Sequence, residues 1–314
     1  MPEMSAFAPT TIRYIKLGSE NRWAAPSLNG GELHFGYGEI PHELCLAGDW
    51  RAVARRVSAT YSWALRDTAR AAGEIKDFYT LGQDCLWIAF ADEHLWWTFA
   101  ALAVVWRGGD GKTHGARVRR AIGAWRNTDL EGNPLVLEAL STRLTKVSGY
   151  RGTICQVKER DYLLRRLRGE DEPMAVQAKA ARAAMLTAAQ DLIAALHWRD
   201  FETFVDLIFA RTGRQRLSRV GGTRKDIDLM LRDPVTGEIA AVQVKSQANQ
   251  AELDDYIERF EATGLYQRIF FICQSPTGPL CNRGRAHVHI WTRERLAELS
   301  LETGLFNWLT DKAA

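Results

Sequence analysis

Two short segments that alternate between apolar and polar residues, joined by a tight connection, constrain the fold of this chain more than any other feature. The segments are residues 225–231 and 241–247, and the connection at residues 233–238 contains the aspartate, proline and glycine typical of a turn. Alternation at every second residue predicts two strands. The short connection predicts that these strands pair as a hairpin.

The hairpin places polar side chains opposite one another. If its centre lies between residues 235 and 236, Asp228 is opposite Gln243 and Asp226 is opposite Lys245. Side chains two residues apart on a strand share a face, so all four lie on the same side of the hairpin.

These residue types suit chemistry on a phosphate. Mg²⁺ prefers oxygen ligands, which Asp228 offers as a carboxylate and Gln243 as a side-chain carbonyl. Lys245 can orient or deprotonate an attacking water and offset the charge that develops on the phosphorus. The alternative is an exposed hairpin with ordinary surface charges, which a lone pair of such residues would favour.

A helix is predicted upstream, at residues 198–213. Apolar residues at helical spacing form one face, Gly213 suits the C-terminal end, and Glu202 is a polar position beside the apolar stripe. The apolar positions are Phe201, Phe204, Val205, Ile208 and Phe209.

Residues 196–314 resemble the Mrr-like branch of the PD-(D/E)xK restriction endonuclease superfamily. In that pattern Glu202 matches the helix acid, Asp228 the metal-binding aspartate, and Gln243 and Lys245 the Gln-x-Lys strand. The resemblance implies a restriction-endonuclease-like α/β/α domain with a mixed sheet. It also implies a DNA endonuclease that uses Mg²⁺, with Mn²⁺ as the alternative ion, bound by Asp228, Gln243 and Glu202. Because one site cuts one strand, a double-strand break implies a homodimer or sequential nicking.

The chain departs from the family pattern at one place. Mrr-like proteins often carry a Gly-Gly-Ile-Asp run, whereas here Gly221 and Gly222 come earlier than the aspartate. Asp226 is therefore either a second metal ligand or a solvated acid at the end of the strand. Gln247 extends the polar face by two more residues. It is either a further contact of the metal site or an ordinary surface residue.

The rest of this domain continues the pattern. We expect Asn249 to cap a helix that runs through Ala262, followed by buried and alternating strands at residues 269–273 and 287–291 and a final helix from Thr292 to about Leu309. The pair His287-x-His289 could bind a metal, but no third ligand is evident nearby, so a polar strand face is favoured.

Charge is distributed unevenly along the chain. The net charge is only +3, yet the segment 211–225 carries basic residues without an acidic one. A basic loop before the aspartate suggests a grip on the DNA backbone, with a solvated loop as the alternative. A second basic run, residues 143–168, is interrupted by Glu159 and Asp161. The predicted DNA contacts are Arg214, Arg216, Arg219, Arg224 and Lys225.

The five cysteines are scattered without a C-x-x-C spacing, so neither zinc nor a disulfide framework is predicted. The chain shows no signal-peptide pattern and no apolar run long enough to span a bilayer, so we expect a cytoplasmic protein without a membrane partner. Composition shifts at residues 169–173 predict a boundary: an N-terminal domain at 1–168, a linker and connecting helix at 169–195, and the nuclease domain at 196–314.

The N-terminal domain holds most of the tryptophans. Strands are predicted at residues 12–17 and 32–37, a helix from Asp49 to about Ala72, and an aromatic hairpin at 85–100 that residues 104–106 extend. This mixture predicts an aromatic-rich, β-barrel-like domain with helices. The overall fold class is therefore α+β or α/β.

In architecture and aromatic content this domain is similar to PUA-like readers of the SRA and EVE types, which hold a flipped, modified base. That resemblance implies a pocket with aromatic stacking, for which the candidates are Tyr37, Trp87, Trp96 and Trp97. Since Trp96 and Trp97 are adjacent, they must point to opposite faces of a strand. The alternative for any of these rings is the domain core.

The sequence thus predicts a Mrr-like endonuclease that acts on double-stranded DNA, expected to be a modification-dependent defence enzyme against foreign DNA. Two alternatives stay open: a repair or junction-processing nuclease, and a catalytically inactive nucleic-acid-binding protein, because Gln243 stands where many relatives have an acid.

Overall fold

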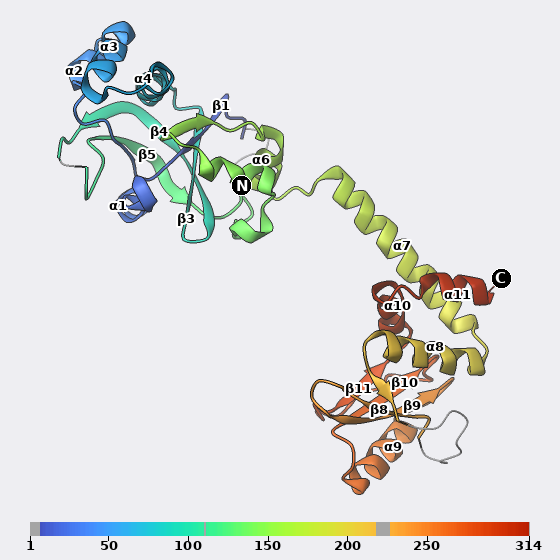
Figure 1. Ribbon diagram of the computed structural model, residues 1–314. Helices are drawn as coiled ribbons and strands as arrows, with labels where there is room; N and C mark the ends of the chain where they lie inside the picture. Colours follow the sequence, from blue (N-terminus) through green and yellow to red (C-terminus); the bar gives the residue numbers. More distant parts are fainter. Residues whose placement is uncertain (1–6, 110, 218–226, 314) are drawn as a thin grey trace. The chain divides into compact units, whose positions relative to one another are not determined.

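The computed structural model describes residues 7–109, 111–217 and 227–313, and the chain divides into two compact units, residues 1–173 and 174–314 (Figure 1). Both units mix helices with a β-sheet, so the α+β class is confirmed. Among the described residues, none of the helices combines the length and apolar character needed to cross a bilayer.

Unit 1 is built on one six-stranded, curved sheet (Figure 1) with the strand order β2-β5-β4-β3-β1-β6. Only the β1–β3 pair is parallel. The strands are β1 (Thr11–Ile15), β2 (Glu32–Phe35), β3 (Cys85–Ala91), β4 (His94–Trp106), β5 (Arg117–Arg126) and β6 (Ile154–Gln156). The predicted aromatic hairpin is β3 and β4, and residues 104–106 do extend β4.

Both faces of this sheet are covered, because β3 is buried at every position. Helices α2–α4 pack on one face and form a core with Phe78 and Trp87, while α5, α6 and the segment before them pack on the other. The helices of unit 1 are α1 (Ala24–Gly30), α2 (His42–Leu46), α3 (Trp50–Tyr61), α4 (Leu65–Thr80), α5 (Thr142–Thr145) and α6 (Arg160–Leu167).

The single helix predicted from Asp49 to Ala72 was wrong. Asp49 does cap α3 by accepting a hydrogen bond from the amide of Ala52. However, α3 ends at Tyr61, the next residue, Ser62, has a left-handed φ of 52°, and α4 begins at Leu65. The periodicity continued across this break because both helices pack their apolar faces on the same side of the sheet.

Unit 2 has a mixed five-stranded sheet in the order β11-β10-β9-β8-β7, in which β9, β10 and β11 are parallel and β7 and β8 antiparallel. The strands are β7 (Gln215–Arg216), β8 (Leu229–Arg232), β9 (Ile239–Lys245), β10 (Arg268–Cys273) and β11 (Val288–Trp291). The helices are α7 (Pro173–Ala195), α8 (Trp198–Arg211), α9 (Gln250–Thr263), α10 (Arg293–Glu302) and α11 (Phe306–Ala313).

Helices lie on both faces of this sheet, which makes the predicted α/β/α sandwich (Figure 1). Alternate residues of β9 separate the two cores: Val242 and Val244 pack with α8, α10 and α11, and Ala241 packs with α9. The predicted final helix is in fact two helices, since Gly304, with φ of 71°, interrupts it.

Candidate active site

The β8–β9 hairpin has the predicted register. Leu229 pairs with Val242 and Leu231 with Ala240, so the hairpin is centred between residues 235 and 236. Asp233 builds the turn: its carboxylate accepts hydrogen bonds from the amides of Val235 and Thr236. The turn therefore fixes which polar residues face each other further along.

One step beyond the paired residues, Asp228 and Gln243 bond directly. The Gln243 side-chain amide donates to Asp228 Oδ2 at 2.6 Å, and the backbone amide of Val244 donates to the same oxygen at 2.7 Å. Asp228 lies just before β8 rather than within the long strand that was predicted from residue 225. Its carboxylate therefore lies at the start of β8, beside β9.

Gln243 is 4% exposed, and its carbonyl Oε1 is buried with no hydrogen-bond partner among the described residues. A buried acceptor without a donor is costly, so such an oxygen suits an external electropositive group. Assignment of the amide nitrogen and oxygen follows from the bond to Asp228, which as a carboxylate can only accept. Asp228 and Gln243 together therefore offer oxygen ligands to a hard cation.

Glu202 projects from the first half of α8 near this pair. Burial is the largest cause that raises the pKa of the Glu202 carboxyl. The negative charge of Asp228 raises this pKa further, because like charges repel each other. Burial likewise raises the pKa of Asp228, against the opposing effects of the Val244 amide and Lys245. Two neighbouring carboxylates whose burial disfavours their charged forms are commonly found where a divalent cation binds.

Lys245 ends β9 on the same face as Gln243. Its ammonium lies 5.1 Å from the centre of the Tyr256 ring, on α9. A hydrogen bond with Tyr256 is the main cause that raises the pKa of Lys245, with its attraction to Tyr256, Asp228 and Glu252 adding to the effect. Lys245 is thus held in its protonated form. Sequence reasoning missed Tyr256, although it follows Asn249 by two turns of the helix that Asn249 caps.

Residues 193–300 match a family model of the restriction endonuclease, the Mrr catalytic domain. The C-terminal unit contains an Mrr-like restriction endonuclease domain. No curated protein matches the chain. Among solved structures, the chain is similar to a DNA modification-dependent restriction endonuclease, AspBHI, at 11% sequence identity and a TM-score of 0.33, over 73% of this chain and 68% of that one. A likeness this distant carries no conclusion about fold or function.

The restriction endonuclease domain identifies a hydrolase that cleaves DNA. The match spans both β9, with Gln243 and Lys245, and the part of α8 that carries Glu202. Within the described residues, no cluster of three or more histidine, cysteine, aspartate or glutamate side chains is close enough to hold a metal. The candidate ligand set is instead two carboxylates and one amide carbonyl.

The remaining candidate ligands of the nuclease domain have different outcomes. Asp226 lies outside the described residues, and Gln247 is exposed beyond the end of β9. His287 pairs with Glu261 at 2.9 Å, whereas the His289 ring stacks on Phe270 at 4.9 Å. The two histidines therefore have separate partners within the protein.

Two of the five predicted DNA contacts are described, and both contact the nuclease domain itself. Arg216 forms an ion pair with Asp206 at 2.9 Å, and the guanidinium of Arg214 packs over Phe270 at 5.0 Å. Arg216 lies in the short strand β7, whereas Arg214 precedes it and keeps a buried guanidinium nitrogen without a hydrogen-bond partner among the described residues. Arg219, Arg224 and Lys225 lie outside the described residues.

Three of the four predicted base-pocket rings do not form a pocket. Trp87 is fully buried, and Trp97 is 4% exposed with its indole nitrogen donating to the carbonyl of Thr128. Trp96 packs on the opposite core from Trp97, as strand alternation requires, and donates to the carbonyl of Ala91. These rings fill the core because both faces of the sheet are covered.

Tyr37 does line a cavity, of about 420 Å³, whose other aromatic residues are Trp23 and Trp63. Beneath it, the buried Glu74 accepts hydrogen bonds from the hydroxyls of Tyr37 and Tyr150 at 3.0 and 3.1 Å. Sequence reasoning missed Trp63 and Glu74. Glu74 could have been found from the sequence, because it is an acid on the otherwise apolar face of α4.

The backbone of Tyr37 is also fixed. Its φ of 59° is left-handed, and its carbonyl accepts a 2.6 Å hydrogen bond from Arg117, which is fully buried. Arg117 also donates to the carbonyls of Gly36 and Ile40. A charged donor thus holds the loop that presents Tyr37 to the cavity.

Proposed function

We propose that this protein is a Mg²⁺-dependent restriction endonuclease that acts on foreign double-stranded DNA, and that unit 1 recognises the DNA. The observation that carries the nuclease site is the contact between Asp228 and Gln243, which leaves a buried carbonyl oxygen without a donor. Glu202 and Lys245 complete the set around it.

Asp228, Glu202 and the Gln243 carbonyl would hold the metal ion, because hard divalent cations prefer oxygen ligands. Mn²⁺ is the alternative ion. When bound, such an ion supplies an acidic water and neutralises charge on the phosphate. The chain's own contribution is Lys245. Since its contacts favour the protonated form, Lys245 orients water and stabilises developing negative charge instead of accepting a proton.

For unit 1, we propose that the cavity bordered by Tyr37 and Trp63 recognises a base, including a modified one. Trp63 is 42% exposed, unusual for a ring of this size, and stacks on Tyr61 at 4.4 Å. An exposed and rigidly supported ring suits stacking on a base. Lys16 and Arg151 at the same cavity supply positive charge, whereas Arg70 is paired with Asp67.

The test is cleavage by purified protein and Mg²⁺ of matched DNAs that are unmodified, cytosine-methylated, hydroxymethylated or glucosylated. Cleavage of one modified substrate alone, lost in Lys245→Ala and made unselective in Trp63→Ala, would support both assignments. Equal cleavage of all four substrates would reject the base reader and keep the nuclease. If none is cut, branched DNA is the next substrate, and binding without any cleavage would leave a nucleic-acid-binding protein.

We also propose a homodimer, because each chain carries one candidate site and a double-strand break needs two cuts. A supercoiled plasmid distinguishes the possibilities. Direct conversion to the linear form, with a dimeric mass in solution, supports the dimer, whereas accumulation of nicked circles by a monomer contradicts it.

A further inference from the structure

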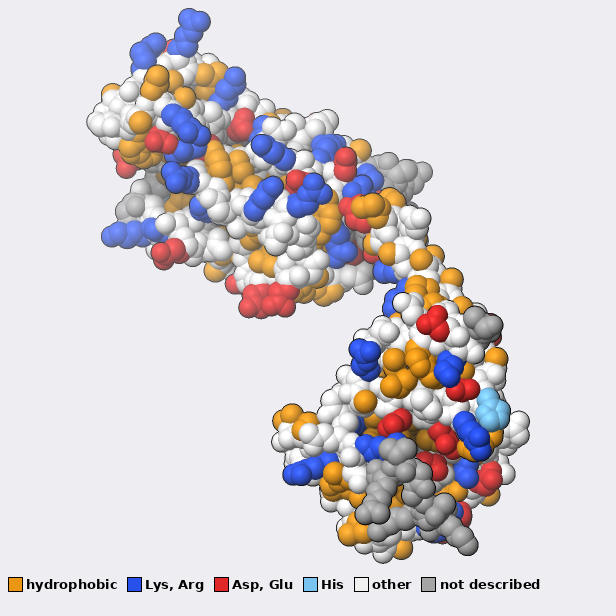
Figure 2. All heavy atoms as spheres, turned by 45° about the vertical axis from the view of Figure 1, so that its right-hand side comes forward, with side chains coloured by type: hydrophobic (Ala, Val, Ile, Leu, Met, Phe, Trp, Pro, Cys, Tyr) orange, Lys and Arg blue, Asp and Glu red, His pale blue; other side chains and the backbone are white. Residues whose placement is uncertain are grey.

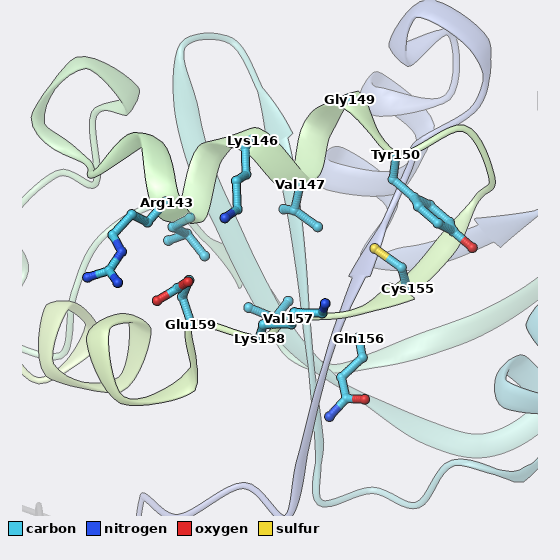
Figure 3. Close-up of a pocket in the computed structure, with 11 residues that line it drawn as sticks. Arg143, Lys146, Val147, Gly149, Tyr150, Cys155, Gln156, Val157, Lys158 and Glu159 are labelled. Atoms are coloured by element: carbon cyan, nitrogen blue, oxygen red, sulfur yellow. The ribbon is translucent and has the colours of Figure 1, made fainter.

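A second cavity of unit 1, of about 530 Å³, plays no part in the functions assigned so far. One wall is α5 and the following 3₁₀ turn, η4 (Lys146–Gly149), and the other is the end of β6 with the residues after it. Figure 3 shows Lys146 and Val147 extending from the helical wall toward the strand wall, which carries Cys155 and Lys158. We call this cavity the β6 pocket.

The β6 pocket is rich in positive charge that the described part of the chain does not neutralise. Arg143, Lys146 and Lys158 line it, and in the described residues none of their side chains forms an ion pair or hydrogen bond. Glu159 is the one acidic side chain among its lining residues. The pocket therefore carries an excess of positive charge.

Other basic residues nearby have partners within the protein. Arg160 donates to the carbonyls of Pro9 and Thr10, Arg168 donates to the carbonyl of Phe7, and Arg165 pairs with Glu172. The basic run at residues 143–168 thus contains arginines that hold the fold and, separately, three cations that line the β6 pocket without a partner among the described residues.

Beneath the cations the pocket is apolar. Leu144 and Val157 are buried at 1% and 4% exposure, and Val147 packs against the same core. Tyr150 closes one side, held by the bond from its hydroxyl to Glu74. A ligand that fits must present negative charge at the rim and an apolar surface within, as a sugar–phosphate unit does.

We propose that the β6 pocket binds the DNA backbone, with a phosphate against Arg143, Lys146 and Lys158 and the deoxyribose over Val147 and Val157. All three cations are exposed, which suits a polymer that passes across the rim. Contacts of this kind fix the position of a protein on DNA without reading its sequence. The proposal rests on the proposed function only in that the ligand is DNA.

The experiment measures binding of the full-length protein to a fluorescent duplex, without divalent metal, at a series of salt concentrations. The variant carries Arg143→Ala, Lys146→Ala and Lys158→Ala. The matched control removes three exposed cations of α3, with Arg51→Ala, Arg55→Ala and Arg56→Ala. Circular dichroism confirms that both fold.

Each lost phosphate contact reduces the slope of log affinity against log salt by about 0.9, so the triple variant, which removes the phosphate contact of the β6 pocket, should lose about one such step. Affinity should fall equally for unrelated sequences, and the control should lose less. An unchanged slope in the triple variant would overturn the proposal. An equal loss of slope in the control would also overturn it, because the effect would then depend only on the total charge of the protein.

A second arm separates DNA from a free nucleotide. Deoxynucleoside monophosphates are added as competitors, and we expect no displacement at concentrations far above that of the duplex. Tight binding of a monophosphate that the triple variant loses would overturn the DNA assignment. Absence of any DNA binding by the wild-type protein would refute the proposed function itself, whereas normal binding and cleavage with an unchanged salt slope would refute the β6 pocket alone.

Discussion

Gln243 donates a 2.6 Å hydrogen bond to Asp228 while its own carbonyl oxygen, buried in the sheet, has no donor among the described residues. The amide of Gln243 can therefore stabilise Asp228, whereas an acid at position 243 would repel it. The amide nitrogen secures the carboxylate, and the amide oxygen is left for a cation.

Replacing Gln243 by glutamate exchanges the donor for a second carboxylate. Without metal, the two acids repel each other across the lost hydrogen bond, so the thermal midpoint of Gln243→Glu should fall below that of the wild type. Mg²⁺ should raise that midpoint more in the variant than in the wild type, because it relieves the repulsion. Differential scanning fluorimetry with and without Mg²⁺ measures both effects, and an equal response of the two proteins would count against a metal at this position.

Replacing Lys245 by alanine should abolish cleavage while DNA affinity is retained. Removal of a positioned proton donor or charge stabiliser costs on the order of 10² to 10⁴ in rate. Single-turnover cleavage gives the rate, and an anisotropy titration without metal gives the affinity. Lys76→Ala, at an exposed position of α4, is the matched control and should cleave normally. Cutting by the Lys245 variant at the wild-type rate would remove Lys245 from the mechanism.

Glu74 should make the stability of unit 1 depend on pH. Burial raises its pKa, in spite of hydrogen bonds from Thr153, Tyr37 and Tyr150. A carboxyl whose pKa is higher in the folded state stabilises the fold at low pH, and that contribution is lost as the pH rises through the raised value. Urea unfolding at several pH values should show this fall, and Glu74→Gln should flatten it. An identical pH profile for the variant would contradict the prediction.

Replacing Asn249 by alanine should destabilise the nuclease domain. Its side chain accepts from the amide of Glu252, whose carboxylate in turn accepts from the amide of Asn249, which is a complete capping box. Loss of such a cap costs about 1 kcal/mol of the free energy of unfolding. Chemical denaturation measures this change. Gln247→Ala, exposed and two residues earlier, should leave the stability unchanged, and an equal loss there would argue against capping.

The local structure of the nuclease site could be predicted from the chain's pattern alone. Alternation and the Asp233 turn fixed the hairpin register and therefore brought Asp228 opposite Gln243, because a short connection leaves few ways to pair two strands. The helix that carries Glu202 and the helix cap at Asn249 could also be predicted, because capping and hydrophobic periodicity depend on residues close together in the chain.

Which aromatic and basic side chains are available to a ligand depends on the folded arrangement of each unit and could not be predicted. Trp87 and Tyr37 are alike in a sequence, but the sheet is covered on both faces, so Trp87 is core and Tyr37 borders a cavity. Arg165 and Lys158 are likewise similar in sequence, yet Arg165 has an acidic partner and Lys158 has none among the described residues. Exposure and pairing depend on residues distant in the chain, and a local pattern carries no information about them.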